Sequence, residues 1–184
     1  MDEAVSSKPW ISHPHIWKSE AEFICWVRGG LRKLWANHPI RTEFKKKHQT
    51  TMVNTNKRSM KRFPTVAAWK CSICHCLTKD IQIDHISDTG GTFISMDDIQ
   101  KYAEYLYFVT DENLRCVCKP CHDIVSYSQK QGISYEEAVI EKKIISMLKK
   151  ENISSTVDFL SEHGYNNVKA KDRRDILRKV LKGE

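Results

Sequence analysis

Two Cys-x-x-Cys pairs, Cys71/Cys74 and Cys118/Cys121, constrain the fold of this 184-residue chain more than any other feature. The pairs are separated by 43 residues, and each has the spacing of a zinc-binding turn. Four thiolates complete the tetrahedral coordination of a structural zinc ion and leave no open position for water. The sequence therefore predicts one closed zinc site that joins two segments distant in the chain.

The other three of the seven cysteines have different expected roles. Cys76 and Cys116 compete as ligands, because each forms a Cys-x-Cys spacing with a member of the two pairs. We rank them as neighbours of the site, since only the first four cysteines form two matching turns. Cys25 lies in an apolar run and is predicted to be a small buried hydrophobe. The odd cysteine count argues against disulfides, as does the reducing cytoplasm expected for this chain.

Composition predicts a globular chain, and the pattern of helices and strands described below predicts an α+β fold that is mainly helical. Hydrophobic residues make up 40% of the chain and charged residues 29%, which separates it from disordered sequences. No run of about 18 apolar residues predicts a membrane span. The first 14 residues lack a basic segment followed by an apolar one, so we expect no signal peptide and a cytoplasmic location.

The first expected helix covers residues 20–36. Ser19 followed by Glu22 forms a capping-box pattern at its start. The apolar stripe predicted for this helix consists of Phe23, Val27, Leu31 and Leu34. Residues 41–62 are basic and poor in large apolar side chains, and they predict a short basic helix followed by a mobile connector.

The centre of the chain predicts a strand, a turn and two helices. Ile81 and Ile83 alternate with polar residues, which indicates a strand that ends in Asp84-His85. Gly90-Gly91 predicts a turn, and a helix is expected from Ser95 to about residue 107. Another helix should begin close to Cys121. Three more helices are expected over about residues 134–150, 156–163 and 169–182.

Positive charge is concentrated in residues 28–70. This segment has twelve Lys or Arg residues against the single acid Glu43, so its net charge is +11, whereas the whole chain carries +7. A one-sided basic block favours contact with the phosphates of a nucleic acid, although a solvated basic face is the alternative. The residues predicted to contact DNA are Arg28, Arg32, Lys33, Lys45, Lys46, Lys47, Lys57, Arg58, Lys61 and Arg62.

Four polar residues near the cysteine pairs have the chemistry of phosphodiester hydrolysis: Asp84, His85, Asn113 and His122. The reaction needs an attacking water, a base that deprotonates it and a cation that neutralises the developing charge. A histidine titrates near neutral pH and suits the role of base. A carboxylate together with a second imidazole can hold a divalent ion.

At these residues the chain resembles the HNH endonucleases, the ββα-metal nucleases. The resemblance covers about residues 69–127 and rests on Cys-Ser-Ile-Cys, on Asp84-His85-Ile86 and on Asn113-Leu-Arg-Cys-Val-Cys-Lys-Pro-Cys-His122. Residues 23–39 and the C-terminal region also resemble the flanks of phage-encoded, homing-endonuclease-like HNH proteins. The chain departs from the family pattern at Val125, where a lysine is frequent, and at Cys116, which adds a thiol.

The resemblance implies a role for each site residue. His85 would be the general base, and Asn113 would brace the loop and orient His85. Asp84 and His122 would hold a catalytic Mg²⁺ or another divalent ion, while Cys71, Cys74, Cys118 and Cys121 would hold structural Zn²⁺. The core would be a treble-clef-like ββα-metal unit stabilised by zinc.

The expected organisation has three regions. Residues 1–67 form an N-terminal arm and a basic DNA-contacting region, residues 68–130 form the nuclease core, and residues 131–184 form a C-terminal helical region. The expected protein is a metal-dependent endonuclease that acts on double-stranded DNA as a monomer or homodimer, in a bacterial host cytoplasm if it is phage-encoded. The alternatives are a non-catalytic zinc-stabilised DNA-binding module, derived from a degenerate nuclease, and a zinc-stabilised protein-interaction adaptor.

Overall fold

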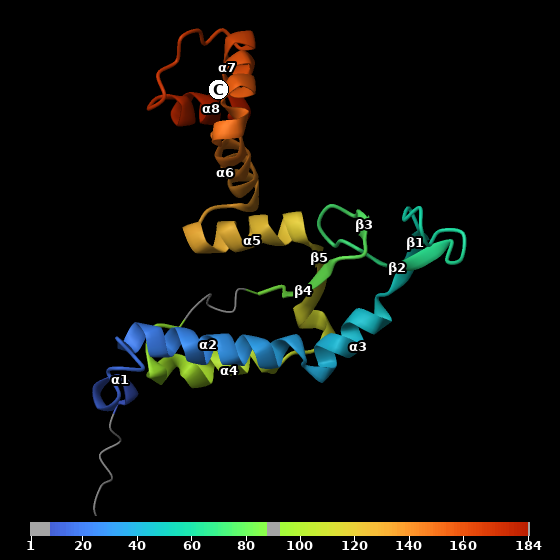
Figure 1. Ribbon diagram of the computed structural model, residues 1–184, viewed down its shortest axis with the longest axis vertical. Coiled ribbons are helices and arrows are strands. Elements are labelled where there is room, and N and C mark those ends of the chain that lie inside the picture. Colours follow the sequence, from blue (N-terminus) through green and yellow to red (C-terminus); the bar gives the residue numbers. More distant parts are fainter. Residues whose placement is uncertain (1–7, 88–92, 184) are drawn as a thin grey trace, which may run out of the picture. The chain divides into compact units, whose positions relative to one another are not determined.

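A computed structural model of the chain describes residues 8–87 and 93–183 (Figure 1). The chain divides into two compact units, Met1–Lys119 and Pro120–Glu184. The predicted turn at Gly90-Gly91 lies outside the described residues. The three regions expected from the sequence stay a prediction, because they were defined by role and the two units are defined by packing.

The first unit contains four helices, five strands and two 3-10 turns among its described residues. The helices are α1 (Pro9–Ser12), α2 (Glu20–Ala36), α3 (Pro39–Lys47) and α4 (Ile99–Tyr107). The strands are β1 (Thr50–Val53), β2 (Thr65–Lys70), β3 (Leu77–Thr78), β4 (Ile81–His85) and β5 (Leu114–Cys118). The 3-10 turns are η1 (Met96–Asp98) and η2 (Asp111–Asn113).

The strands form two small antiparallel sheets. One sheet has the order β1-β2-β3, and the other pairs β4 with β5 (Figure 1). The β4–β5 register places Asp84 opposite Arg115 and His85 opposite Leu114. The predicted strand ending in Asp84-His85 is therefore confirmed, and its partner begins at the residue after Asn113.

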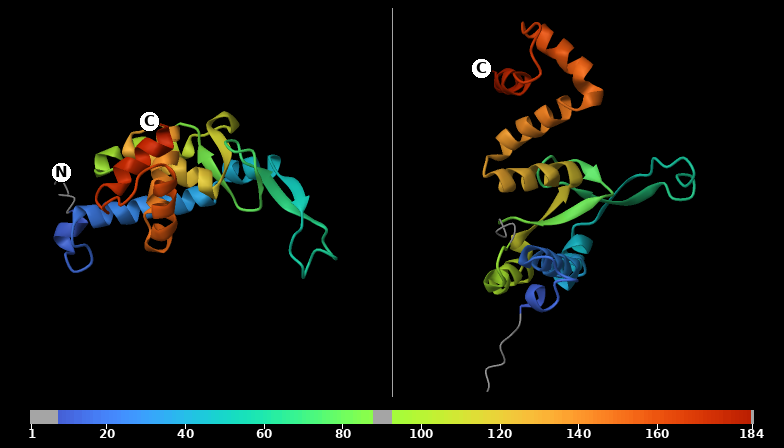
Figure 2. Two further views of the ribbon diagram at one scale, coloured as in Figure 1. Left: turned by 90° about the horizontal axis from the view of Figure 1, so that it is seen from above. Right: turned by 60° about the vertical axis from the view of Figure 1, so that its left-hand side comes forward.

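Helices α2 and α4 lie side by side and enclose an apolar cluster (Figures 1 and 2). Ile24 of α2 is buried in this cluster with Tyr102 and Leu106 of α4. The Tyr107 hydroxyl donates to the Leu31 carbonyl over 2.7 Å and ties the two helices together. A second cluster contains side chains from both sheets and from α3. Its buried residues include Ile81, Ile83, Leu114, Trp69 and Phe44. The two clusters meet at Trp35, so α2 spans both.

The bounds predicted for α2 are correct, but two of its side chains lie elsewhere than expected. The Ser19 side chain caps the helix by accepting from the Glu22 amide over 3.3 Å. Leu34 is 64% exposed, because α4 packs on the side of the helix that presents Ile24 and Trp35. Cys25 is also exposed, so its predicted burial is wrong. It is the next residue after Ile24, and adjacent residues lie about 100° apart around a helix.

The basic region 41–62 is more ordered than predicted. It contains α3, as expected, but the predicted mobile connector is wrong. Thr50–Val53 forms strand β1, whose Thr51 pairs with Ala67 of β2. The residues between the two strands form a hydrogen-bonded loop around the buried Asn54. The Thr- and Asn-rich composition therefore reflects a hairpin and its turn residues.

The second unit contains the remaining helices. They are α5 (Lys119–Gln131), which starts at the boundary between the units, α6 (Tyr135–Met147), α7 (Ile153–Glu162) and α8 (Arg173–Lys182), with the 3-10 turn η3 (Lys150–Asn152). Ser134 and Glu137 form the predicted capping box of α6. Gly164 follows His163, the C-cap residue of α7, and has φ +86°, as the predicted C′ glycine requires. Ile144, Leu160 and Leu177 form the core of this unit.

The predicted fold class, α+β and mainly helical, is confirmed. In the part of the chain that the structure describes, no helix has both the length and the apolar character needed to cross a bilayer.

Candidate active site and metal centre

Four cysteine sulfurs converge at one point of the structure. The Sγ atoms of Cys71, Cys74, Cys118 and Cys121 all lie within 4.8 Å of one another, and those of Cys74 and Cys118 are 3.7 Å apart. In a tetrahedral zinc site with Zn–S bonds of about 2.3 Å, the sulfurs are about 3.8 Å apart. The four cysteines therefore fit a structural zinc ion, in agreement with the predicted ligand set.

The backbone around Cys71 has the geometry of a metal-binding turn. The Cys118 amide donates to the Cys71 sulfur over 3.4 Å. The turn closes at His75, which has φ +60° and donates its amide to the Cys71 carbonyl. Burial raises the pKa of the Cys71 thiol, but the amides of Cys118, Cys74 and Ile73 donate to the sulfur, and the net result is a lowered pKa. These donors stabilise the thiolate form that zinc requires.

The two competing cysteines lie beside this set. The Cys76 sulfur is 3.2 Å from that of Cys74, and this contact is the largest of the influences that raise the pKa of Cys76 to about 12. Cys116 is 4% exposed and belongs to the apolar cluster around Ile83. Burial raises the pKa of the Cys116 thiol. Both residues are neighbours of the four-sulfur group, as predicted.

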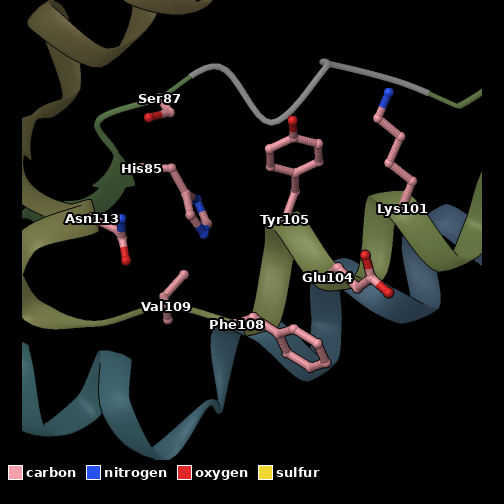
Figure 3. Close-up of a pocket in the computed structure, with 8 residues that line it drawn as sticks. All are labelled: His85, Ser87, Lys101, Glu104, Tyr105, Phe108, Val109 and Asn113. Atoms are coloured by element: carbon pink, nitrogen blue, oxygen red, sulfur yellow. The ribbon is translucent and has the colours of Figure 1, made fainter.

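His85 and Asn113 lie at the same end of the antiparallel β4–β5 pair. They line a pocket of about 440 Å³ together with Ser87 and residues of α4 and the segment that follows it (Figure 3). Tyr105, Glu104 and Lys101 come from α4. The pocket therefore offers a histidine, one carboxylate and one cation next to an exposed aromatic side chain.

The His85 ring is held by the α2–α4 layer. Its Nε2 lies 3.2 Å from the Leu106 carbonyl oxygen, and its ring centroid lies 4.5 Å from that of Trp35. A carbonyl oxygen can only accept, so Nε2 carries the proton and Nδ1 keeps a lone pair in the neutral ring. Burial lowers the pKa of His85, and nearby His38 lowers it further, while the Leu106 carbonyl and Asp84 act in the opposite direction. The net lowering favours the neutral ring at pH 7.

Asn113 braces the loop that leads into β5. Its Oδ1 accepts from the Thr110 amide over 2.9 Å and from the Thr110 hydroxyl over 3.0 Å. Its backbone carbonyl accepts from the Ile86 amide over 2.8 Å, directly after His85. Asn113 thus connects the turn η2 to the end of β4, and it holds the strand end that carries His85.

Asp84 lies on the opposite face of β4 from His85, because successive strand residues alternate. Its Oδ2 accepts from Nη2 and Nε of Arg115, over 2.8 and 3.0 Å. Arg115 is its direct partner on the neighbouring strand β5, and the Asp84 side chain is only 14% exposed. The predicted metal ligand is therefore also one half of a cross-strand ion pair.

His122 is half-buried in the first turns of α5. It belongs to the second unit and Asp84 to the first, so their pairing as metal ligands stays a prediction. Within residues 8–87 and 93–183, the four-cysteine group is the one cluster of three or more metal-binding side chains. Val125 is buried, so this position presents no side chain to phosphate.

The predicted DNA-contacting cations lie on three elements of the first unit: α2, α3 and the loop between β1 and β2. Three of them also serve the fold. Arg32 donates to the Tyr102 hydroxyl, the Lys45 ammonium lies over the Trp69 ring, and Lys47 forms an ion pair with Asp111.

Three features of the site escaped the sequence-based reasoning: Trp35, the Leu106 carbonyl and Arg115. A backbone carbonyl leaves no trace in a residue pattern, and Trp35 reaches His85 only through the packing of α2. Arg115 could be found only once the register was known, because antiparallel pairing that sets His85 opposite Leu114 also sets Asp84 opposite Arg115.

Comparisons with known proteins found no relative of this chain. A scan of the sequence against protein-family models, a search of curated proteins and a search of solved structures each returned no match.

Proposed function

We propose that this protein is a metal-dependent DNA endonuclease of the HNH type. The observation that carries the proposal is the position of His85. Its ring lines the pocket at the end of β4, and its Nε2 lies 3.2 Å from the Leu106 carbonyl oxygen, so that Nδ1 is the nitrogen able to accept a proton. The elements that carry the site occur in the order β4, β5 and α5, with η1, α4 and η2 inserted between the two strands. Two antiparallel strands followed by a helix are the order expected of that family.

In this proposal each residue has a defined task. His85 takes the proton from the attacking water, and Asn113 holds the strand end that positions His85. Asp84 and His122 would hold the catalytic Mg²⁺ or another divalent ion. The bound ion would stabilise charge on the scissile phosphate. Structural Zn²⁺ would occupy the four-cysteine group and hold the turn at Cys71 against β5.

The basic cations of α2, α3 and the β1–β2 loop would bind the DNA backbone. The segment has a net charge of +11, and phosphate contacts are not specific for sequence. Phosphate contacts of this kind would account for binding of double-stranded DNA of any sequence. The protein would act in the cytoplasm of its host.

One observation favours a second candidate, a DNA-binding module without catalysis. Arg115 holds one oxygen of Asp84 with two hydrogen bonds, and its positive charge opposes a cation at the same carboxylate. In a degenerate nuclease such an ion pair would replace the catalytic metal.

Plasmid nicking separates the two candidates. We expect the purified protein to convert supercoiled plasmid to the open-circular form with added Mg²⁺ or Mn²⁺, and not when the divalent ion is omitted. DNA binding should persist in both conditions. Binding without cutting, under either ion, would support the non-catalytic module. No binding to DNA would contradict both and leave the adaptor.

His85 should titrate below the usual range of a histidine. Because burial lowers the pKa of His85 in the folded chain, its imidazole ring should stay neutral until the pH falls below about 6.5. An NMR titration of the imidazole, without added divalent ion, measures this midpoint. The unfolded chain binds this proton more readily, so His85 protonation should also reduce the free energy of unfolding as pH falls below about 6.5. A midpoint above 6.5 would refute the burial argument.

Replacing Arg115 with glutamine tests whether Asp84 can hold a divalent ion. The variant removes the charged hydrogen-bond partner of the largely buried Asp84 carboxylate, and we expect it to lower the free energy of unfolding by about 1–3 kcal/mol. Urea unfolding measures the loss, with the exposed Arg58→Gln as matched control. If Asp84 is a metal ligand, Mg²⁺ or Mn²⁺ should raise the melting temperature of Arg115→Gln more than that of the parent. An equal shift in both proteins would favour the second candidate.

A further inference from the structure

The loop between β1 and β2, residues 54–64, carries a concentrated positive charge. It contains four cations and no acidic residue, namely Lys57, Arg58, Lys61 and Arg62. All four side chains are exposed. In the part of the chain that the structure describes, none of the four takes part in an ion pair. The hairpin projects away from α2 and α4 (Figures 1 and 2), so these charges face solvent at its tip.

This loop is held in one conformation by Asn54, which is 2% exposed. The Asn54 side-chain amide donates to the Phe63 carbonyl over 2.7 Å and to the Ser59 hydroxyl over 3.1 Å. Its Oδ1 accepts from the Asn56 amide over 3.0 Å. The Asn54 and Pro64 backbones close the loop with a further bond of 2.9 Å. A partner that binds this loop therefore meets an ordered surface, which lowers the entropic cost of binding.

Two large apolar side chains stand among the four cations. Met60 is 44% exposed and Phe63 is 54% exposed. The Arg62 guanidinium lies 5.2 Å from the centre of the Phe63 ring, so charge and apolar surface are adjacent. Neither residue is among those of the two apolar clusters described above. Together they leave apolar surface exposed next to four cations, and an apolar patch rimmed by polar residues is typical of an interaction site.

We propose that this loop is a wedge that enters the minor groove of duplex DNA. Lys57, Arg58, Lys61 and Arg62 would contact the phosphates on both sides of the groove, and Phe63 and Met60 would insert between base pairs and bend the duplex. Proteins that bend DNA from the minor groove combine Arg or Lys with an inserted Phe or Met in this way. The inference rests on the proposed function only in taking duplex DNA as the ligand, and it needs no catalysis.

Charge and shape both favour this ligand. Four unpaired cations with no acid repel a basic partner and match the phosphate backbone. A two-stranded ribbon can present the side chains of its loop to a groove of DNA, and the insertion of Phe or Met between base pairs is a feature of minor-groove binding. In A-form RNA the minor groove is wide and shallow, so a wedge shaped for DNA should not act there.

The test uses His85→Ala protein without added divalent ion, so that cutting cannot occur. The probe is a mixed-sequence DNA duplex of about 30 base pairs with a donor dye at one end and an acceptor dye at the other. Binding is followed by anisotropy over a range of salt concentrations, and bending is followed by energy transfer. An RNA duplex of the same sequence serves as the second probe.

Two variants separate the phosphate contacts from the wedge. In the charge variant the four loop cations are replaced by glutamine. Its plot of log affinity against log salt should be shallower by about 3.6, since each lost phosphate contact removes about 0.9. The matched control replaces four exposed lysines of the second unit, Lys143, Lys149, Lys150 and Lys171, and should keep the parent slope.

In the wedge variant Met60 and Phe63 are replaced by serine. The salt slope should stay at the parent value, while the energy-transfer change on binding falls by roughly half or more. Val53→Ser, an exposed position on β1 that lies outside the loop, should bend DNA like the parent. Melting temperatures equal to that of the parent show that the variants remain folded.

The outcomes are distinct from those of the nicking assay. Unchanged slope in the charge variant, unchanged bending in the wedge variant, or equal bending of the RNA duplex would each overturn the wedge. A protein that bends DNA but never nicks a plasmid would keep the wedge and refute the proposed endonuclease. A protein that nicks plasmid but does not bend DNA would keep the proposed endonuclease and refute the wedge.

Discussion

Replacing His85 with alanine is expected to reduce plasmid nicking by about 10²- to 10⁴-fold while DNA binding stays at the parent level. General base catalysis by a positioned side chain contributes a factor of this size. The Nε2 proton of His85 is donated to Leu106, and the Nδ1 lone pair is the acceptor that the variant removes. Rates are measured with Mg²⁺ or Mn²⁺ in excess, and binding is measured by anisotropy.

The histidine control for this experiment is His163→Ala. His163 is exposed at the end of α7 in the second unit, and its Nδ1 contacts the Phe159 carbonyl. This variant should nick plasmid at the parent rate. If His85→Ala cuts as fast as the parent, His85 is not the base. A His85→Ala protein that loses DNA binding as well would indicate a structural role for the ring next to Trp35.

Replacing Cys118 with serine is expected to abolish zinc binding and to unfold the region around the turn at Cys71 and the end of β5. The four-cysteine group joins the turn at Cys71 to the end of β5, and the three remaining cysteines leave one coordination position without a thiolate. Structural zinc contributes on the order of 10 kcal/mol of apparent free energy in zinc-finger peptides. Metal analysis of the purified protein measures the zinc content, and a thermal melt measures the stability.

Two cysteine variants serve as matched controls for this prediction. Cys116→Ser should keep its zinc, because Cys116 lies in the apolar cluster around Ile83, although burying a hydroxyl there costs about 1–3 kcal/mol. Cys25→Ser should keep both zinc and stability, since Cys25 is exposed. A chelator should lower the melting temperature of the parent and leave Cys118→Ser unchanged. Loss of zinc in Cys116→Ser, with Cys118→Ser still loaded, would reverse the ligand assignment.

The sequence by itself determined the features that depend on neighbouring residues. Ser19 and the Ser134/Glu137 pair mark the starts of α2 and α6, because a capping side chain and the amide it accepts from lie within one turn. Spacing alone selected Cys71, Cys74, Cys118 and Cys121 over Cys76 and Cys116, and these four are the cysteines whose sulfurs converge in the structure. The alternation at Ile81 and Ile83 predicted the strand that ends in Asp84-His85. Each of these signals acts over a few residues.

Only the tertiary structure decided what depends on partners distant in the chain. Leu34 and Cys25 are exposed because α4 covers one particular side of α2. Helical spacing in the sequence does not determine which side of the helix is covered. The Asp84–Arg115 ion pair follows from the register of two strands 31 residues apart, and the Leu106 carbonyl reaches His85 from 21 residues away. The basic, Thr- and Asn-rich composition of residues 41–62 did not indicate that part of this segment would pair with β2. Strand pairing and the buried Asn54 make the segment an ordered hairpin. Such pairing and burial depend on the residues that pack against a segment, and not on its own composition alone.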